Sequence, residues 1–308
     1  MDENIGISAV IPLLNEEGNL SRLHAELSEV MQGMGLSYEL IFVDDGSTDA
    51  SFEILKKLAA ADPHTKGISL SRNFGHQIAL MAGLDKSRGA VVVSLDADLQ
   101  HPPSLIPVLY EKYRSGYDIV NTSRLDTAGA GPLKKLSSRM FYSLLRSLSE
   151  VNLPAGSADF RLMSRTAVEA LKSMPERDRF TRGMVNWLGF KQTYVDYEAP
   201  KRFSGTTKYS LRKMMKLALD AITSFSPKPL RISLYLGMTA VIPCLFYSVY
   251  AIYRHFAGDT IEGWTSLLLV VLLFGGIQLI SLGIIGEYLA RVFTEIKARP
   301  LYIIKEVI

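Results

Sequence analysis

Two carboxylates and an amide follow a short apolar run near residue 95. The run covers residues 90–95, and the polar residues after it are Asp96, Asp98 and Gln100. Such a run is typical of a buried parallel strand, and ligands of open α/β sheets bind just beyond the carboxyl ends of strands. Hard oxygen atoms at this point suit Mg²⁺ or Mn²⁺ carrying a diphosphate, because these ions take part of their ligands from phosphate and water. The spacing therefore predicts a metal–diphosphate site, with a plain polar turn as the structural alternative.

Further strands are predicted on both sides of this run, and polar side chains follow each of them. The predicted strands cover residues 7–12, 38–43, 67–70 and 117–121. Apolar residues at helical spacing predict a helix over 17–31 and two further helices that extend to residues 58 and 84. Ser47 or Thr48 is expected to cap the helix that extends to residue 58. Strands that alternate with helices predict a doubly wound, mostly parallel α/β sheet. The sequence contains neither a dinucleotide-binding G-x-G-x-x-G motif nor a P-loop.

The last third of the chain has a different composition. No charged residue lies between Arg231 and Arg254 or within 263–286, and each stretch is long enough to cross a bilayer as a helix. Lys and Arg residues are concentrated before the first stretch and after the second, which predicts that both termini are cytoplasmic. Residues 209–225 alternate apolar and basic positions at helical spacing, which predicts an amphipathic helix at the membrane interface. Buried core helices are the alternative for all three segments.

Charge and cysteine content limit the function classes. The 308 residues carry a formal charge of +3, which does not favour a nucleic-acid partner, and the one cysteine, Cys244, lies in the first uncharged stretch. Disulfides are therefore not expected. We predict a catalytic domain over 1–206, a juxtamembrane helix over 207–230, two membrane helices over 231–290 and a cytoplasmic C-terminal tail over 291–308.

Several motifs, taken in order, resemble known enzymes. Residues 10–17, 43–49, 73–75 and 96–103 resemble the family-2 glycosyltransferases with the GT-A fold. Residues 158–163, 180–183 and 202–209 resemble the polyprenyl-phosphate branch, which includes dolichyl-phosphate mannose synthases and bacterial bactoprenol glucosyltransferases. Residues 286–291 and 299–302 resemble the bactoprenol enzymes in particular.

The resemblance implies roles for individual residues. It assigns the nucleotide sugar to Pro12, Asn15, Glu17, Asp44, Asp45, Asp96, Ala97, Asp98 and Arg124. It assigns the metal to Asp98 and Gln100 with Asp96 close by, and the chemistry to Asp159, Arg124, Arg202 and Lys208. The arginines and the lysine are expected to clamp the diphosphate and the acceptor phosphate, since guanidinium groups bind phosphate in a fork. Asp159 occupies the position of the family's catalytic base, but a phosphomonoester is already mostly a dianion at neutral pH, so we expect Asp159 to orient the acceptor or Arg161 instead.

The expected reaction is the inverting transfer of a hexose to polyprenyl phosphate on the cytoplasmic membrane face. Glucose from UDP-glucose is the expected donor, with GDP-mannose or a UDP-linked amino sugar as alternatives. The expected cofactor is Mg²⁺ or Mn²⁺, and the expected partners are the donor, the lipid acceptor and the bilayer. A homo-oligomer and a noncatalytic membrane scaffold stay open as further possibilities.

Overall fold

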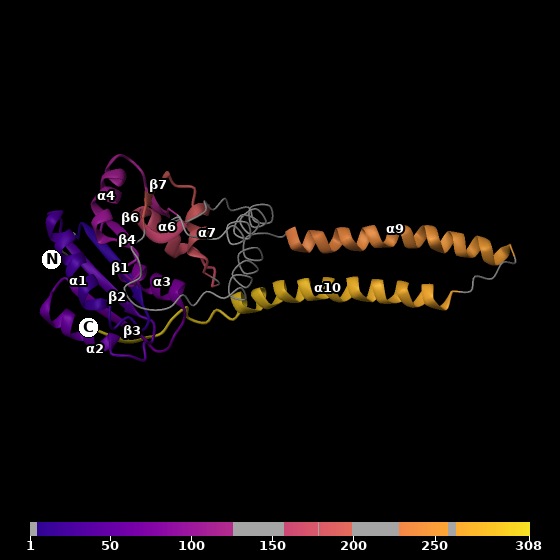
Figure 1. The fold of residues 1–308 in the computed structure, drawn as a ribbon, viewed down its shortest axis with the longest axis horizontal. Coiled ribbons are helices and arrows are strands. Elements are labelled where there is room, and N and C mark those ends of the chain that lie inside the picture. Colours follow the sequence, from indigo (N-terminus) through magenta and orange to yellow (C-terminus); the bar gives the residue numbers. More distant parts are fainter. Residues whose placement is uncertain (1–4, 126–156, 178, 199–227, 258–262) are drawn as a thin grey trace. The chain divides into compact units, whose positions relative to one another are not determined.

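The structure is a computed structural model, and it describes residues 5–125, 157–177, 179–198, 228–257 and 263–308 (Figure 1). These residues fall into two compact units. The first is an α/β unit that includes the C-terminal segment 299–308, and the second is a helical unit that contains residues 228–298.

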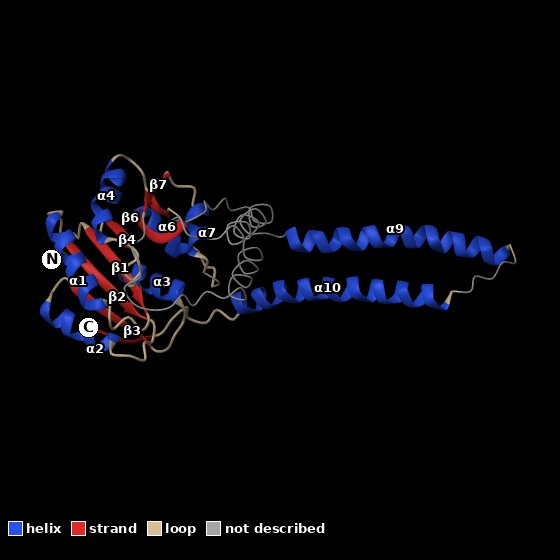
Figure 2. Cartoon of the chain, viewed as in Figure 1, coloured by secondary structure: helices blue, strands red, loops and turns tan. Residues whose placement is uncertain are grey.

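An eight-stranded sheet, drawn in red in Figure 2, forms the centre of the α/β unit. Its strands, in the spatial order β7-β5-β6-β4-β1-β2-β3-β8, are Gln192–Tyr197, Ile119–Arg124, Ser157–Ser164, Val91–Ser94, Ile7–Leu13, Tyr38–Asp44, Thr65–Leu70 and Ile304–Val307. β1 to β5 confirm the predicted strands. β1 pairs in parallel with β2 and β4, β2 with β3, and β5 with β7. The predicted mostly parallel α/β sheet is therefore present.

The sequence analysis did not predict β6, β7 or β8. β6 runs antiparallel to both β4 and β5, and its register places Arg161 opposite Ser94 at the end of β4. The start of β6 therefore lies at the same edge of the sheet as the loop that follows β4. This pairing brings Asp159 to the edge where the polar residues after β1, β2 and β4 lie.

Helices cover both faces of the sheet. They are α1 Leu20–Gly33, α2 Ser51–Ala61, α3 His76–Lys86, η1 Pro103–Leu105, α4 Ile106–Arg114, α6 Arg165–Ser173 and α7 Thr181–Trp187. α1 buries an apolar stripe from Leu20 to Met31 against alternate side chains of β1, such as Ile11. α3 packs on the opposite face, where a Cβ at Gly83 would lie only 2.2 Å from Val10 Cγ1. Glycine here lets α3 lie close to the central strands and so places its first turn at the site edge.

The predicted cap of α2 is wrong. α2 begins after Ala50, which has no capping side chain, and neither Ser47 nor Thr48 occupies the cap position. Ser47 Oγ instead accepts a hydrogen bond from the Asn15 amide, and the Thr48 amide donates to Asn15 Oδ1. The two hydroxyl residues therefore hold the β1 and β2 loops together.

The helical unit consists of α9, Lys228–Phe256, and α10, Trp264–Ile296. Within them, Lys228–Arg254 and Leu273–Ile296 are long and apolar enough to cross a membrane, with mean hydropathies of 1.7 and 1.5. Large apolar side chains such as Phe246 and Leu279 are more than 70% exposed, as expected for lipid-facing positions. The amphipathic helix predicted over 209–225 lies outside the described residues.

The C-terminal segment returns to the α/β unit. β8 pairs antiparallel with β3, and Gly67 and Ile308 exchange two backbone hydrogen bonds. Tyr302 also donates a hydrogen bond of 2.8 Å to Asp85 of α3. The predicted domain boundaries treat residues 291–308 as a tail, and they did not anticipate this strand.

Candidate active site

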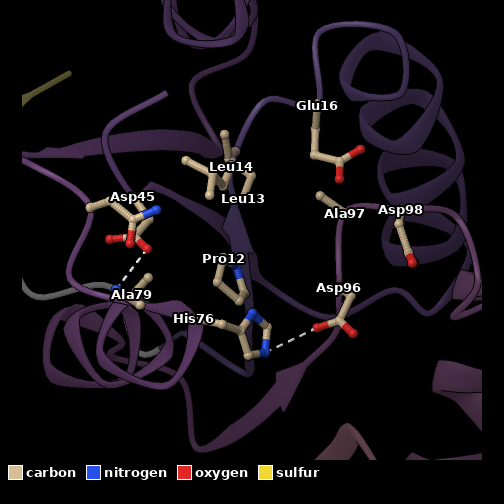
Figure 3. A pocket seen from close by; sticks show the side chains of 12 residues that line it. Pro12, Leu13, Leu14, Glu16, Asp45, His76, Ala79, Asp96, Ala97 and Asp98 are labelled. Atoms are coloured by element: carbon tan, nitrogen blue, oxygen red, sulfur yellow. Dashed lines mark hydrogen bonds and ion pairs between the residues drawn. The ribbon is translucent and has the colours of Figure 1, made fainter. Parts of the chain in front are cut away.

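A cleft of about 230 Å³ lies at the carboxyl ends of β1, β2 and β4. Figure 3 shows Pro12 on its floor, Asp45 on one side, Asp96 and Asp98 on the other, and His76 projecting from the start of α3. The complete lining is Pro12, Leu13, Leu14, Glu16, Asp45, Asn73, Gly75, His76, Ala79, Asp96, Ala97 and Asp98. Five of the predicted nucleotide-sugar residues are thus in this cleft: Pro12, Asp45, Asp96, Ala97 and Asp98.

The loop after β4 has a constrained backbone. Leu99 is buried and has a φ of 61°, a left-handed conformation that non-glycine residues adopt only when their surroundings enforce it. Asp98 accepts a hydrogen bond from the Gln100 amide, and the Asp96 amide donates to Nδ1 of His101. His101 in turn stacks on Phe160 of β6, with ring centroids 5.3 Å apart. These contacts set the orientation of both aspartates.

The donor atoms fit a divalent ion that is shared with a phosphate ligand. Asp96 Oδ1 is buried and accepts no hydrogen bond from the described residues, and its nearest charged neighbour is His76 Nε2 at 3.3 Å. No group of three or more His, Cys, Asp or Glu side chains among the described residues is arranged to hold a metal by itself. A metal next to Asp96 and Asp98 would therefore need oxygen ligands from the substrate, as is usual for Mg²⁺ at phosphate sites.

The two carboxylates after β2 have different environments. Asp44 is buried and accepts hydrogen bonds from the Ser47 amide and the Ser69 hydroxyl, so it stabilises its own loop. Asp45 lines the cleft and accepts hydrogen bonds from the amides of Phe74 and Gly75. Burial raises the pKa of Asp45, although these two amides act against the shift. Asp45 therefore links the cleft to the segment that leads into α3.

The residues after β1 mainly bind the neighbouring loop. Asn15 has a φ of 57° and accepts hydrogen bonds from Thr48, while Glu17 accepts one from the Ala50 amide. Neither side chain is part of the cleft lining. Glu16, which the sequence analysis did not select, does line it.

Asp159 lies at the centre of a cluster of cations. Its carboxylate accepts a fork from Arg182, with Nε at 3.0 Å and Nη2 at 2.8 Å, and a further bond from Arg161 Nη2 at 2.9 Å. Gln77 Nε2 lies 3.3 Å from Asp159 Oδ2 and connects the cluster to α3. Burial by itself would raise the pKa of Asp159, but Arg182 and Arg161 outweigh it and hold the pKa of this carboxyl well below its usual range. Asp159 is therefore ionised throughout the physiological pH range.

His76 connects the Asp159 cluster to the cleft. Its Nε2 lies 3.3 Å from Asp96 Oδ1 and 3.7 Å from Asp159 Oδ2. The sequence analysis noted residues 73–75 and 180–183 as motifs but gave no role to His76, Gln77 or Arg182. The two motifs could have indicated these residues, because His76 and Gln77 follow residues 73–75 and Arg182 lies within 180–183.

The predicted phosphate clamps are described in part. Arg124, at the exposed end of β5, has Nη1 3.3 Å from Gln100 Oε1. This contact places its guanidinium beside the loop that carries Asp98, although it also engages the amide oxygen predicted to bind the metal. Arg202 and Lys208 lie outside the described residues.

Comparison with known proteins places the chain in a family. The model of glycosyl transferase family 2 matches residues 8–172, which include the β4 loop and Asp159. The chain belongs to this family. A second family model, the GtrB C-terminal hairpin, matches residues 228–292. The α/β unit is accordingly a GT-A-like glycosyltransferase domain, and the chain is a glycosyltransferase.

Individual relatives match over nearly the whole chain. An uncharacterized glycosyltransferase, YkcC, of Bacillus subtilis is 44% identical over 99% of this chain and 95% of its own length. A prophage bactoprenol glucosyl transferase homolog of Escherichia coli is 40% identical over 98% of this chain and 99% of its own. The bactoprenol glucosyl transferase of Shigella phage SfV is 39% identical over 97% of this chain and 98% of its own length.

A solved structure also matches part of the chain. Glucosyl-3-phosphoglycerate synthase from Mycobacterium tuberculosis, in complex with Mn²⁺, UDP and glucosyl-3-phosphoglycerate, is 22% identical with a TM-score of 0.47. The match covers 71% of this chain and 78% of that chain. A score at this level adds nothing to the assignment above.

Proposed function

We propose that this chain transfers one glucose residue from UDP-glucose to a polyprenyl phosphate at the cytoplasmic face of a membrane. The observation that carries the proposal is the alignment with proteins named bactoprenol glucosyl transferase, which extends over 97% of this chain and includes the helical hairpin. Similarity over the hairpin supports a lipid acceptor, because a soluble acceptor would not require membrane helices. GDP-mannose and UDP-linked amino sugars stay as alternative donors.

The site supports direct displacement at the anomeric carbon. A phosphate oxygen of the lipid forms the new bond to this carbon while the bond to the nucleotide diphosphate breaks, which inverts the configuration and gives a β-linked product. Because the lipid phosphate is already mostly a dianion at neutral pH, no proton has to be removed from it. The electron pair of the broken bond leaves on the diphosphate, so the chief demand on the protein is to position the reactants and stabilise that charge.

Several side chains are placed for these tasks. We assign the nucleoside to the part of the cleft beside Pro12 and Asp45, and the diphosphate to Asp98 and Arg124. A bound Mg²⁺ or Mn²⁺ would supply positive charge to the leaving diphosphate, held by Asp98 together with Asp96 or Gln100. We assign the acceptor phosphate to the side of Asp159 and Arg182, with Arg202 and Lys208 as further clamps. These assignments remain proposals.

A donor panel tests the function. Detergent-solubilised protein would be supplied with a short polyprenyl phosphate and, separately, with UDP-glucose, GDP-mannose and a UDP-amino sugar, while release of nucleotide diphosphate and formation of glycolipid are measured. We expect lipid-dependent UDP release with UDP-glucose. Transfer from a different donor would replace the sugar assignment, and no transfer from any donor would favour a noncatalytic scaffold.

The metal assignment is tested with one substitution and one chelator. Asp98→Ala should lower turnover at least about a hundredfold with little change in thermal stability, because its carboxylate faces the cleft and not the core. EDTA should abolish wild-type activity, and Mg²⁺ or Mn²⁺ should restore it. Asp196→Ala, an exposed aspartate on β7, is a matched control that should keep full activity. Undiminished transfer in excess chelator would exclude a metal requirement.

A further inference from the structure

The two neighbours of His76 in the chain, Gly75 and Gln77, are held by hydrogen bonds. The preceding residue, Gly75, has a φ of 102° and donates its amide to Asp45 Oδ2 at 2.9 Å. The following residue, Gln77, contacts Asp159 through its amide nitrogen, and its oxygen accepts hydrogen bonds from the backbone amide and hydroxyl of Thr181. His76 is thus the first residue of α3, with the backbone anchored at each side.

The side chain itself remains accessible to a ligand. His76 lines the cleft, its side chain is 41% exposed, and in Figure 3 its ring points between Pro12 and Asp96. The same nitrogen, Nε2, lies 3.3 Å from Asp96 Oδ1 and 3.7 Å from Asp159 Oδ2. His76 therefore occupies the space between the DxD loop, Asp96 to Asp98, and the Asp159 cluster.

This space is where the transferred sugar has to lie, if the donor and acceptor bind as proposed above. The diphosphate is assigned to the Asp98 side and the acceptor phosphate to the Asp159 side, so the anomeric carbon must be between them during the reaction. An imidazole nitrogen can donate a hydrogen bond or accept one, which matches the hydroxyl groups of a hexose.

We propose that His76 binds a hydroxyl of the transferred hexose and thereby determines which sugars react. This inference rests on the proposed function and goes one step beyond it, because it assigns sugar selection to a residue of α3. A site built to hydrogen-bond a hydroxyl discriminates against a donor that lacks it, because its polar groups are then left unpaired. His76 accordingly acts as a specificity and positioning residue, and no proton transfer is required of it.

The test pairs enzyme variants with donor analogues. Wild type, His76→Ala and His76→Gln would each be assayed for kcat/KM with UDP-glucose and with its 2-, 3-, 4- and 6-deoxy analogues. For one deoxy analogue, we expect the kcat/KM of wild type to be about tenfold lower than its kcat/KM with UDP-glucose. The kcat/KM of His76→Ala with UDP-glucose should be about tenfold lower than that of wild type, and it should fall little further with that analogue. His76→Gln, which keeps a donor and an acceptor, should recover part of the rate.

Binding of UDP separates sugar recognition from a purely structural role. All His76 variants should bind UDP as wild type does in titration calorimetry, because the contact proposed is with the sugar. His64→Gln is a matched control, since His64 stacks on Tyr38 just before β3, at the opposite edge of the sheet. It should leave every rate unchanged.

Two results would overturn the inference. One is an additive effect of His76→Ala with all four deoxy analogues, and the other is a loss of UDP affinity as large as the loss of kcat/KM. The failure of the proposed function is a separate result, because wild type itself would then transfer no glucose from UDP-glucose.

Discussion

Asp159 illustrates how the environment of one side chain decides its chemistry. A general base must be able to take up a proton near the working pH. Asp159 is buried among Arg161, Arg182 and Gln77, and the two arginines keep its pKa far below that range. A carboxylate held in this way is a weak base but a rigid anchor for the two guanidinium groups. We therefore propose that Asp159 orients other groups, as expected from the acceptor's own ionisation.

This interpretation predicts a flat pH dependence. Asp159→Asn should lower kcat by nearly the same factor at pH 5.5 and at pH 8, because the folded-state pKa of Asp159 lies below both values and the residue is ionised at each. The lipid phosphate, with a second pKa near 6, changes its charge between these pH values. A pH–rate profile of kcat for both proteins measures the effect. A deficit that is large below pH 6 and disappears above pH 7 would instead identify Asp159 as a base.

The same substitution has a cost in stability that the assay must control. Asp159→Asn leaves the buried Arg161 without its counter-ion, and breaking a buried ion pair in this way typically costs about 3–5 kcal/mol. Thermal unfolding should be recorded first, and kinetics should be measured well below the transition of the variant. Glu39→Gln, which neutralises a buried carboxylate paired with Lys66 away from the cleft, is a matched control for the loss of a buried negative charge.

At the scale of elements, strands with a local apolar pattern could be predicted from the sequence, whereas strands that depend on long-range pairing could not. β1 to β5 were predictable because their apolar runs are local signals, and the polar residues after β1, β2 and β4 follow directly from those strands. β6 was not predictable in the same way, because its buried residues include the charged Asp159 and Arg161, which interrupt the apolar pattern of a buried strand. The links from His76, Gln77 and Arg182 to Asp159 depend on that strand, so sequence reasoning missed them.

β8, at the end of the chain, also depends on long-range pairing, and Gly67 of β3 packs against it. A Cβ at Gly67 of β3 would lie 2.6 Å from Ile308 Cγ1 and 2.9 Å from Leu55 Cδ2. Gly67→Ala should therefore destabilise the protein by about 1–3 kcal/mol, because this part of the core would be overpacked.

Ile308→Ala tests the origin of that loss. It should be mildly destabilising by itself, but it removes the closest clash, so the double variant should be more stable than the sum of the single effects predicts. Thermal unfolding of the four proteins in detergent provides the cycle. Strict additivity would show that Ile308 does not pack against Gly67 in solution.

At the scale of the whole molecule, β8 also constrains topology. β8 follows α10 in the chain and is part of the same sheet as β3, so, if α9 and α10 cross a membrane, the segment after α10 is on the same side as the α/β unit. Two crossings, by α9 and α10, satisfy this condition, whereas one crossing does not. The excess of Lys and Arg outside the two helices favours the cytoplasm for that side.

Cysteine labelling tests this arrangement in intact cells or right-side-out vesicles. In a Cys244→Ala background, Asp259→Cys should react with a membrane-impermeant maleimide from outside, because the sequence places residue 259 between the two spans. Glu306→Cys, at a β8 position whose side chain is 42% exposed, should react only after the membrane is permeabilised. External labelling of position 306 with protection of 259 would reverse the orientation. Labelling of both positions from outside would be incompatible with two membrane crossings, because β8 and the loop between the spans would then share one side.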